Sequence, residues 1–224
     1  KRTSEELAAK NTIIDTQLKE KELLVREIHH RVKNNLQTVS SLLSIQGRGI
    51  TDEKAKEAVN DGRLRVKSMA LIHQDLYREG DLSGVRMKEY VAKLVNGLVT
   101  SYGMGERVHA RIAVEDIALD VDTAVPIGLV LNELVTNALK YAWPGVRSGE
   151  LRVRVEREGE RLFLSVIDDG VGSTAIGGPH EGASGFGLNM IRTFADKLKA
   201  EWGIERNEEG TTVTMSIRNF KLAR

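Results

Sequence analysis

The stretch Asn132-Glu133-Leu134-Val135-Thr136-Asn137-Ala138-Leu139-Lys140-Tyr141 decides the fold of this 224-residue chain. Its periodicity predicts a helix on which Asn137 and Lys140 lie within about 40° of Glu133, at about 100° per residue. Carboxylate and amide oxygens suit Mg²⁺, and a lysine suits phosphate. The alternative is an ordinary solvated helix face. The opposite half is apolar and can pack on a sheet, through Leu131, Leu134, Val135, Ala138 and Ala142.

The composition excludes several classes of protein. Lys and Arg number 33 against 32 Asp and Glu, so no basic field argues for nucleic acid. The absence of cysteine excludes disulfides, zinc thiolates and cysteine nucleophiles, and it favours a cytoplasmic location. No apolar run of about 18 residues predicts a membrane span, although the parent protein can still be tethered to a membrane. The chain begins inside a helical pattern, so we expect a longer protein with an upstream part.

The first eighty residues predict two long helices. Residues 4–46 contain no Pro or Gly, and apolar residues at 3/4 spacing predict one amphipathic helix with a coiled-coil-like lead-in. After a break at 46–52, Asp52 is the expected N-cap of a second helix over 53–78. Because such a hairpin buries little surface alone, we expect it to pair with a second copy in a four-helix bundle.

Two adjacent histidines lie on the first predicted helix. On a helical wheel His30 falls about 160° from the apolar Val32, whereas His29 falls about 60° from it, at the edge of the core. An exposed imidazole can act as a nucleophile or accept a phosphoryl group. The alternative is an ordinary surface or helix-edge histidine. Neighbouring positions diverge too far on a helix for a zinc pair.

Residues 85–224 predict a second domain, in which helices pack on a sheet. Helices are expected over 87–102, from Asp122 as N-cap to Ala142, and over 188–198. Three helices and five strands favour an α+β fold, an α/β sandwich with its helices on one side of a mostly antiparallel sheet. The strands are predicted near 107–114, 151–155, 162–166, 201–206 and 211–218.

Two glycine-containing stretches in this domain suggest a ligand site. Asp168 ends a predicted strand before Gly170 and Gly172, and its carboxylate can accept a hydrogen bond from an amine such as that of adenine. Gly185-Phe186-Gly187-Leu188 opens a helix, where free amides favour phosphate. Residues 173–184 between them are rich in Gly, Ser and Ala, which predicts a mobile lid or a plain surface loop.

In fixed order, E-x-x-x-N, D-x-G-x-G, G-x-G-L and G-T-T-V resemble the Bergerat-type (GHKL) ATP-binding fold of Hsp90, gyrase B, MutL and histidine kinases. The stretch Ile28-His29-His30-Arg31-Val32-Lys33-Asn34-Asn35-Leu36-Gln37 resembles the phosphoacceptor helix of the HisKA_2 family, close kin of the HWE histidine kinases. The resemblance covers about residues 20–218. It implies the core of a two-component sensor histidine kinase, an ATP:protein-histidine phosphotransferase that uses ATP and Mg²⁺.

The resemblance also implies roles for individual residues. His30 matches the phosphorylated histidine, Asn137 would ligate Mg²⁺, and Glu133 would assist metal or proton handling. Arg31 follows His30 where the commoner pattern has an acidic base, so Glu27, one turn back, is a candidate base. The expected ATP-binding residues are Lys140 and Tyr141 on the first helix, Asp168, Gly170 and Gly172 near adenine, Gly185, Phe186, Gly187 and Leu188 near the phosphates, and Thr211 and Thr212 on the adenine side.

The resemblance implies partners as well. These are the receiver domain of a separate response regulator, a missing upstream sensor domain and a second copy bound through the hairpin, although related groups also include monomers. Residues 1–80 would form the lead-in and phosphoacceptor hairpin, and residues 85–224 the ATP-binding domain. Two alternatives stay open: an anti-sigma-type serine kinase or plain ATPase of the same fold, and a nucleotide-sensing pseudokinase that acts as a dimerisation module.

Overall fold

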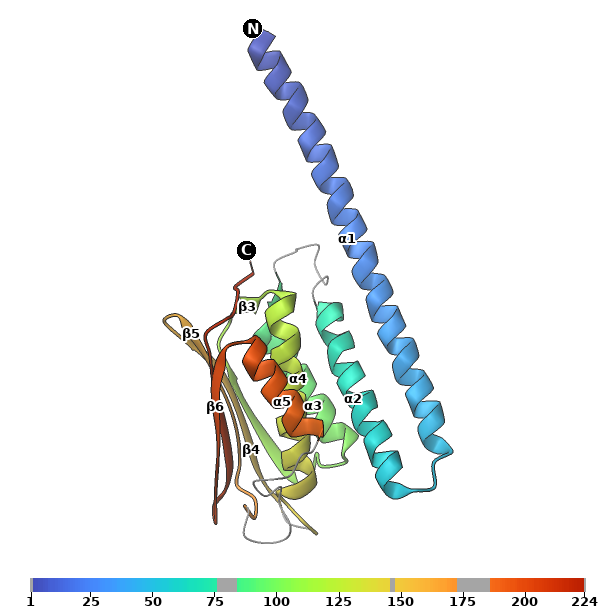
Figure 1. Ribbon diagram of the computed structural model, residues 1–224, viewed down its shortest axis with the longest axis vertical. Helices are drawn as coiled ribbons and strands as arrows, with labels where there is room; N and C mark the ends of the chain where they lie inside the picture. The colour runs from blue at the N-terminus through green and yellow to red at the C-terminus, as the bar shows by residue number, and fades with distance from the viewer. Residues whose placement is uncertain (1, 76–83, 146–147, 173–185, 224) are drawn as a thin grey trace.

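The computed structural model describes residues 2–75, 84–145, 148–172 and 186–223 (Figure 1). A long helix, α1 (Arg2–Arg48), packs against an antiparallel helix, α2 (Glu53–Asp75). The Asp52 carboxylate accepts a hydrogen bond from the Ala55 amide at 2.7 Å, so Asp52 caps α2 as predicted. The predicted helical hairpin is thus confirmed. The predicted end of α2 at residue 78 lies outside the described residues.

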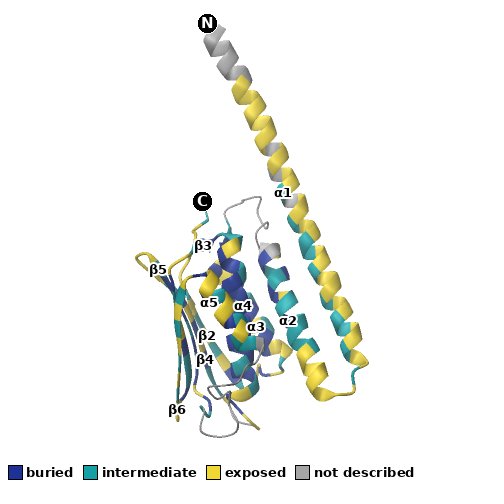
Figure 2. Ribbon diagram, viewed as in Figure 1, coloured by how far each residue is buried: buried dark blue, intermediate teal, exposed yellow. Residues whose placement is uncertain are grey.

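The N-terminal half of α1 extends beyond the rest of the chain (Figure 1). Large apolar residues are exposed along it, and its described part is drawn mostly in the yellow of exposed residues in Figure 2. Ile14 and Leu18 of the predicted coiled-coil-like lead-in are among them. An apolar stripe of this kind is unusual on a monomer and marks a surface for association. Its most exposed members are Ile13, Ile14, Leu18, Leu23, Leu24 and Ile28.

A five-stranded sheet has the order β2-β4-β5-β7-β6. Every neighbouring pair is antiparallel except β2 and β4, which are parallel because helix α4 crosses between them. The mostly antiparallel sheet predicted from the alternating segments is therefore confirmed. The strands are β2 (Val108–Val114), β4 (Gly149–Glu158), β5 (Arg161–Asp168), β6 (Ala200–Asn207) and β7 (Gly210–Ile217).

Three helices cover one face of this sheet (Figure 1): α3 (Met87–Ser101), α4 (Val121–Tyr141) and α5 (Phe186–Lys197). Alternate strand residues such as Leu151, Val153 and Val155 are fully buried beneath them. The predicted apolar half of α4 is buried in the same core. The α+β sandwich is thus confirmed. The polar face of helix α4 is turned away from the sheet.

Two local features differ from the sequence-based expectations. The N-cap of α4 is Asp120, which accepts a hydrogen bond from the Thr123 amide at 2.9 Å, so the prediction of Asp122 is wrong. The helix begins earlier because the chain leaves strand β3 (Ala118–Leu119) immediately before it. This strand pairs with β1 (Val85–Arg86) in a small second sheet that was not predicted, since two-residue strands show no alternation.

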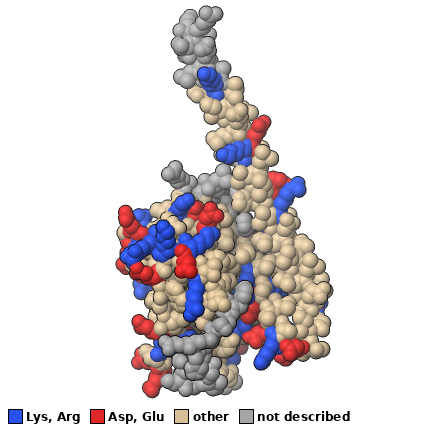
Figure 3. All heavy atoms as spheres, viewed as in Figure 1, with Lys and Arg blue, Asp and Glu red and all other residues tan. Residues whose placement is uncertain are grey.

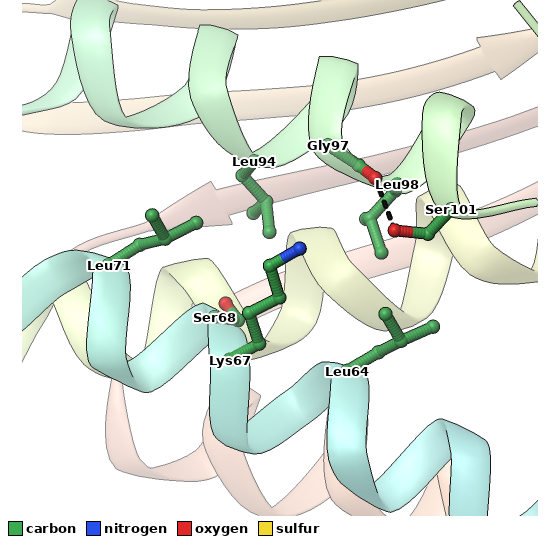
Figure 4. A pocket seen from close by; sticks show the side chains of 8 residues that line it. All are labelled: Leu64, Lys67, Ser68, Leu71, Leu94, Gly97, Leu98 and Ser101. Atoms are coloured by element: carbon green, nitrogen blue, oxygen red, sulfur yellow. Dashed lines mark hydrogen bonds between the residues drawn. The ribbon is translucent and has the colours of Figure 1, made fainter. Parts of the chain in front are cut away.

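Helix α2 packs on the helical layer, whereas α1 lies on the outer side of α2 (Figure 1). The Ser68 hydroxyl is 3.0 Å from the Tyr90 hydroxyl of α3, and the Asn132 amide donates to the Leu64 carbonyl at 3.4 Å. A small groove between α2 and α3 is lined by apolar residues together with Lys67, Ser68 and Ser101 (Figure 4). None of the described helices has the length and apolar character needed to cross a membrane.

Candidate active site

The polar face of α4 is covered by α2. Glu133 is only 6 % exposed, so the alternative of a solvated helix face is wrong. Asn137, one turn further along, and Lys140 are half-buried, while Tyr141 is exposed. A buried carboxylate needs a charged or hydrogen-bonding partner, because desolvation of an ion is costly. The partners of this face therefore decide what it can do.

Side chains of α2 supply these partners. Arg65 binds Glu133 Oε2 through Nη2 at 2.7 Å and through Nε at 3.2 Å. The Lys140 ammonium lies 2.7 Å from Asp61 Oδ2 and 2.6 Å from Glu57 Oε1. Sequence analysis did not single out these three α2 residues. Their four-residue spacing does indicate a charged stripe on one helix face, but it does not identify what the stripe contacts.

Lys140 is a charged group in this arrangement. Burial lowers the pKa of Lys140, but hydrogen bonds to Asp61 and Glu57 outweigh burial, and the pKa is raised above its ordinary value. The Tyr102 hydroxyl donates to Asp61 Oδ1 at 3.2 Å. Burial raises the pKa of Tyr102 to about 12, so this hydroxyl stays protonated and can donate. Asp61 is thus bound by both an ammonium and a phenol.

Asp168 lies at the end of β5 and is 7 % exposed. Its Oδ1 accepts hydrogen bonds from the amides of Gly170 at 3.1 Å and Thr211 at 3.2 Å. Burial raises the pKa of Asp168, and the two backbone donors oppose that rise. Because the amides both use Oδ1, Oδ2 keeps acceptor capacity for a ligand amine. The carboxylate is therefore buried and oriented.

The two glycines after Asp168 lie so close to neighbouring chain segments that a Cβ atom would not fit at either position. A Cβ on Gly170 would overlap Ala142 at the end of α4, and the Val171 amide donates to the Ala142 carbonyl at 2.9 Å. Gly172 has φ +60° and leaves no space for a Cβ beside the Asn207 carbonyl. The D-x-G-x-G stretch thus brings the Asp168 loop against the end of α4 and the β6–β7 turn.

The start of α5 reaches the same helix. A Cβ on Gly187 would overlap Glu133 Oε1, so only glycine allows the first turn of α5 to approach the carboxylate this closely. Leu188, the residue after Gly187, is half-buried. Phe186 begins α5, but its side chain lies outside the described residues, as do Gly185 and the predicted lid. Glu133 and the second glycine of G-x-G-L are therefore brought together.

The two threonines of the last strand have different surroundings. Thr211 pairs with Asp168 and Thr212 pairs with Ile167 across β5 and β7. Because side chains alternate along a strand, Thr211 shares the helix-covered face with Asp168, whereas Thr212 lies on the opposite face of the sheet. The structure therefore does not bring Thr212 to the expected adenine side.

His30 is exposed on α1, and the adjacent His29 is half-buried, as the helical wheel predicted. Burial lowers the pKa of His29. The candidate base Glu27 pairs instead with Arg31, whose Nε lies 2.7 Å from Glu27 Oε1, and both side chains are exposed. Because α2 stands between α1 and α4 (Figure 1), the structure does not bring His30 to Glu133.

The donor set on α4 fits a magnesium ion that is shared with a ligand. Within the described residues, no group of three or more His, Asp or Glu side chains forms a metal-binding cluster. Mg²⁺ commonly binds one or two protein oxygens together with substrate phosphates and water. The carboxylate of Glu133 and the amide oxygen of Asn137, one turn apart, are suited to that arrangement. A site made of protein ligands alone is not supported.

Substitution of Gly210 tests how closely the site depends on backbone packing. Gly210 has φ +133°, and a Cβ there would overlap the Asp168 carbonyl. We expect Gly210→Ala to lower the free energy of unfolding by about 2 kcal/mol or more, because a strained backbone and a steric overlap combine. Thermal unfolding measures this change. Gly203→Ala is the matched control: it lies on the neighbouring strand β6 with no atom within 4 Å of the added Cβ. Equal melting temperatures for both variants would contradict the expectation.

Comparison with known families agrees with this geometry. Residues 106–217, half of the chain, match the model of the histidine kinase-like ATPase domain. Residues 27–102, which include both His30 and α2, match the HisKA_2 histidine kinase model. The chain belongs to the histidine kinase-like ATPase family, in which the ATPase domain implies ATP binding.

Individual relatives extend the similarity over most of the chain. The sensor histidine kinase PdtaS of Mycobacterium tuberculosis is 34 % identical over 91 % of this chain and 41 % of its own length. Blue-light-activated histidine kinase 2 of Erythrobacter litoralis is 28 % identical over 85 % of this chain and 56 % of its own length. The chain thus spans about half the length of these curated relatives.

A solved structure shows the same fold. The histidine kinase domain of a blue-light-activated kinase from Erythrobacter litoralis matches with a TM-score of 0.64 and 23 % identity. The match covers 86 % of this chain and 94 % of that domain. It therefore includes the helices as well as the sheet.

Proposed function

We propose that this chain is the catalytic core of a two-component sensor histidine kinase. It transfers the γ-phosphoryl group of ATP to His30 and then to an aspartate of a separate response regulator. The observation that carries the proposal is Asp168, a buried carboxylate oriented by two amides at a strand end. Such a group is suited to recognition of the adenine amine, and it occurs here in a chain of the histidine kinase-like ATPase family.

In this proposal the residues of the sandwich bind Mg·ATP. Asp168 accepts the adenine amine, Gly170 and Gly172 shape the pocket, and Thr211 fixes the Asp168 carboxylate. Glu133 and Asn137 bind Mg²⁺, which would neutralise charge on the phosphates when bound. The phosphates bind at Lys140 and Tyr141 and at the stretch Gly185, Phe186, Gly187 and Leu188, the last three of which open α5. Thr212 is left out because it lies on the other face of the sheet.

The transfer step uses the exposed imidazole of His30. A neutral ring nitrogen attacks the γ-phosphorus in line, a P–N bond forms, and the bond to the bridging oxygen breaks, so that ADP leaves. Because α2 separates α1 from α4, the hairpin must move relative to the sandwich, or His30 must come from a second copy. We therefore propose that residues 1–80 are the phosphoacceptor unit and residues 85–224 the ATP-binding unit.

The proposed partners follow from the exposed surfaces of α1. Its apolar stripe would pair with a second copy of the chain. The polar surface around His30 would receive the receiver domain of a response regulator, and α1 would transmit a signal from an upstream sensor domain. The use of ATP and the absence of cysteine favour a cytoplasmic location.

The direct test is incubation of the chain with Mg²⁺ and γ-³²P-ATP, followed by acid and alkali treatment and mapping of the label. We expect a label that acid removes and alkali does not, located on His30, because a phosphoramidate hydrolyses in acid. A label that resists acid and maps to serine would instead support the serine kinase alternative. Nucleotide binding without any transfer, also in a longer chain with its upstream part, would support the pseudokinase alternative.

A further inference from the structure

We propose that three residues of α2, namely Glu57, Asp61 and Arg65, form an autoinhibitory latch on the nucleotide-binding face of α4. In this arrangement the latch holds α2 against the residues that Mg·ATP needs, and nucleotide and latch exclude each other. The inference rests on the proposed function, since it assigns Glu133 and Lys140 to the nucleotide.

The charges of the latch match those of α4 in register. Arg65 faces Glu133, and the acidic pair Asp61 and Glu57 faces Lys140. The latch residues are spaced by four, so they lie in one row along α2. The two helices run in opposite directions along this contact, because the later residue of α2 meets the earlier residue of α4. Opposite charges therefore meet at both ends of the row, which indicates a specific contact between α2 and α4.

Two of the three latch contacts, Arg65–Glu133 and Asp61–Lys140, are also shielded from water, whereas the Glu57 side chain is 51 % exposed. The side chains of Arg65, Glu133, Lys140 and Asp61 are between 8 % and 18 % exposed. Ion pairs on an open surface contribute little, because water and salt screen them, whereas a buried charge that loses its partner is costly. Neighbouring polar contacts support the same packing: Tyr102 donates to Asp61, and Asn132 donates to the Leu64 carbonyl. Separation of the Arg65–Glu133 and Asp61–Lys140 pairs is therefore costly unless each charge finds a replacement partner.

Mg·ATP offers those replacements. A magnesium ion provides a cation for Glu133 in place of Arg65, and a phosphate provides an anion for Lys140 in place of Asp61 and Glu57. A bound nucleotide thus favours release of α2, and by thermodynamic linkage release of α2 raises nucleotide affinity by the same factor. Because α2 is joined to α1 by the turn at 49–52, a movement of the hairpin would change access to the site.

The first test compares latch variants with matched controls on α2. We expect Arg65→Gln and Asp61→Asn to bind a fluorescent ATP analogue with Mg²⁺ about tenfold more tightly than the unaltered chain, within the usual range of coupling between sites. Lys67→Gln removes one positive charge in the groove shared with α3, and Glu53→Gln removes one negative charge that pairs with Lys56 within α2. Both positions are exposed, so both variants should bind as the unaltered chain does. Thermal unfolding of each variant confirms that it is folded.

The outcomes separate the latch from the proposed function. If Arg65→Gln and Asp61→Asn bind the analogue no more tightly than their controls, the latch is wrong while nucleotide binding stands. If no variant and no unaltered chain binds the analogue, the latch and the proposed function both fail.

A second test follows the position of α2 directly. Since the chain contains no cysteine, Glu53→Cys on α2 and Lys197→Cys on α5 provide two unique sites for nitroxide labels. We expect Mg·ATP to change the distance distribution between the labels, and Arg65→Gln to produce the changed distribution without nucleotide. A distribution that neither nucleotide nor Arg65→Gln alters would overturn the latch.

Discussion

Replacement of His30 with Gln is expected to reduce incorporation of ³²P from γ-labelled ATP to background. The glutamine amide has a similar length but no nucleophilic nitrogen, so no P–N bond can form. Binding of the ATP analogue should be unchanged, because His30 is exposed on the outer helix α1, which α2 separates from α4. Autoradiography and an equilibrium binding titration of the same preparation measure the two effects separately.

His29→Gln is the matched control for this substitution. It makes the same chemical change at the next residue, where the side chain is half-buried at the edge of the hairpin. We expect it to retain labelling on His30. Labelling that persists in His30→Gln, or that disappears equally in both variants, would remove His30 from its proposed role.

Asp168→Asn is expected to weaken ATP binding by about 10- to 100-fold, the range that corresponds to loss of a hydrogen bond with a charged group. Asn retains the shape of the side chain, but only one of its two terminal atoms accepts a hydrogen bond. If the asparagine oxygen accepts the hydrogen bonds from the Gly170 and Thr211 amides, the asparagine NH₂ group faces the adenine amine. Both groups are then donors, so no hydrogen bond forms between them. The reversed orientation places the NH₂ group against those two amides. Isothermal titration of ATP measures the loss.

Inosine triphosphate provides the control ligand for this prediction, because its base lacks the exocyclic amine. We expect Asp168→Asn to weaken ATP binding much more than inosine triphosphate binding, since the asparagine NH₂ can donate to the inosine oxygen. Near-equal losses for both nucleotides would indicate damage to the fold instead of lost recognition of adenine. The melting temperature of the variant distinguishes such damage independently.

The exposed charged residues of the molecule differ from the charged residues of the candidate site in how far they are shielded from water. On the face drawn in Figure 3, acidic and basic side chains alternate over the exposed parts of the sheet, and no single sign dominates. Exposed charged side chains of the strands pair with each other, as Arg154 does with Glu156 at 3.1 Å. Such pairs contribute little to stability. The shielded pairs between α2 and α4 are therefore the electrostatic contacts with the greatest consequence for the site.

The sequence by itself was sufficient to predict the elements whose patterns are local. The apolar periodicity of Asn132–Tyr141 predicted α4, alternation predicted the five main strands, and Asp52 predicted the start of α2. The helical wheel also distinguished exposed His30 from half-buried His29. These features depend on residues a few positions apart, because one turn of helix or one pair of strand residues already determines which way a side chain points.

Only the tertiary structure decided which surfaces meet. Periodicity shows that one face of α4 is polar, but the partners of Glu133 and Lys140 lie 68 and 79 residues earlier, on α2. Strand register placed Thr212 on the face opposite Asp168, and the two-residue pairing of β1 with β3 moved the start of α4 to Asp120. The physical reason is that burial and charge pairing depend on the helix or strand that packs opposite, and a residue's own neighbours in sequence do not contain that information.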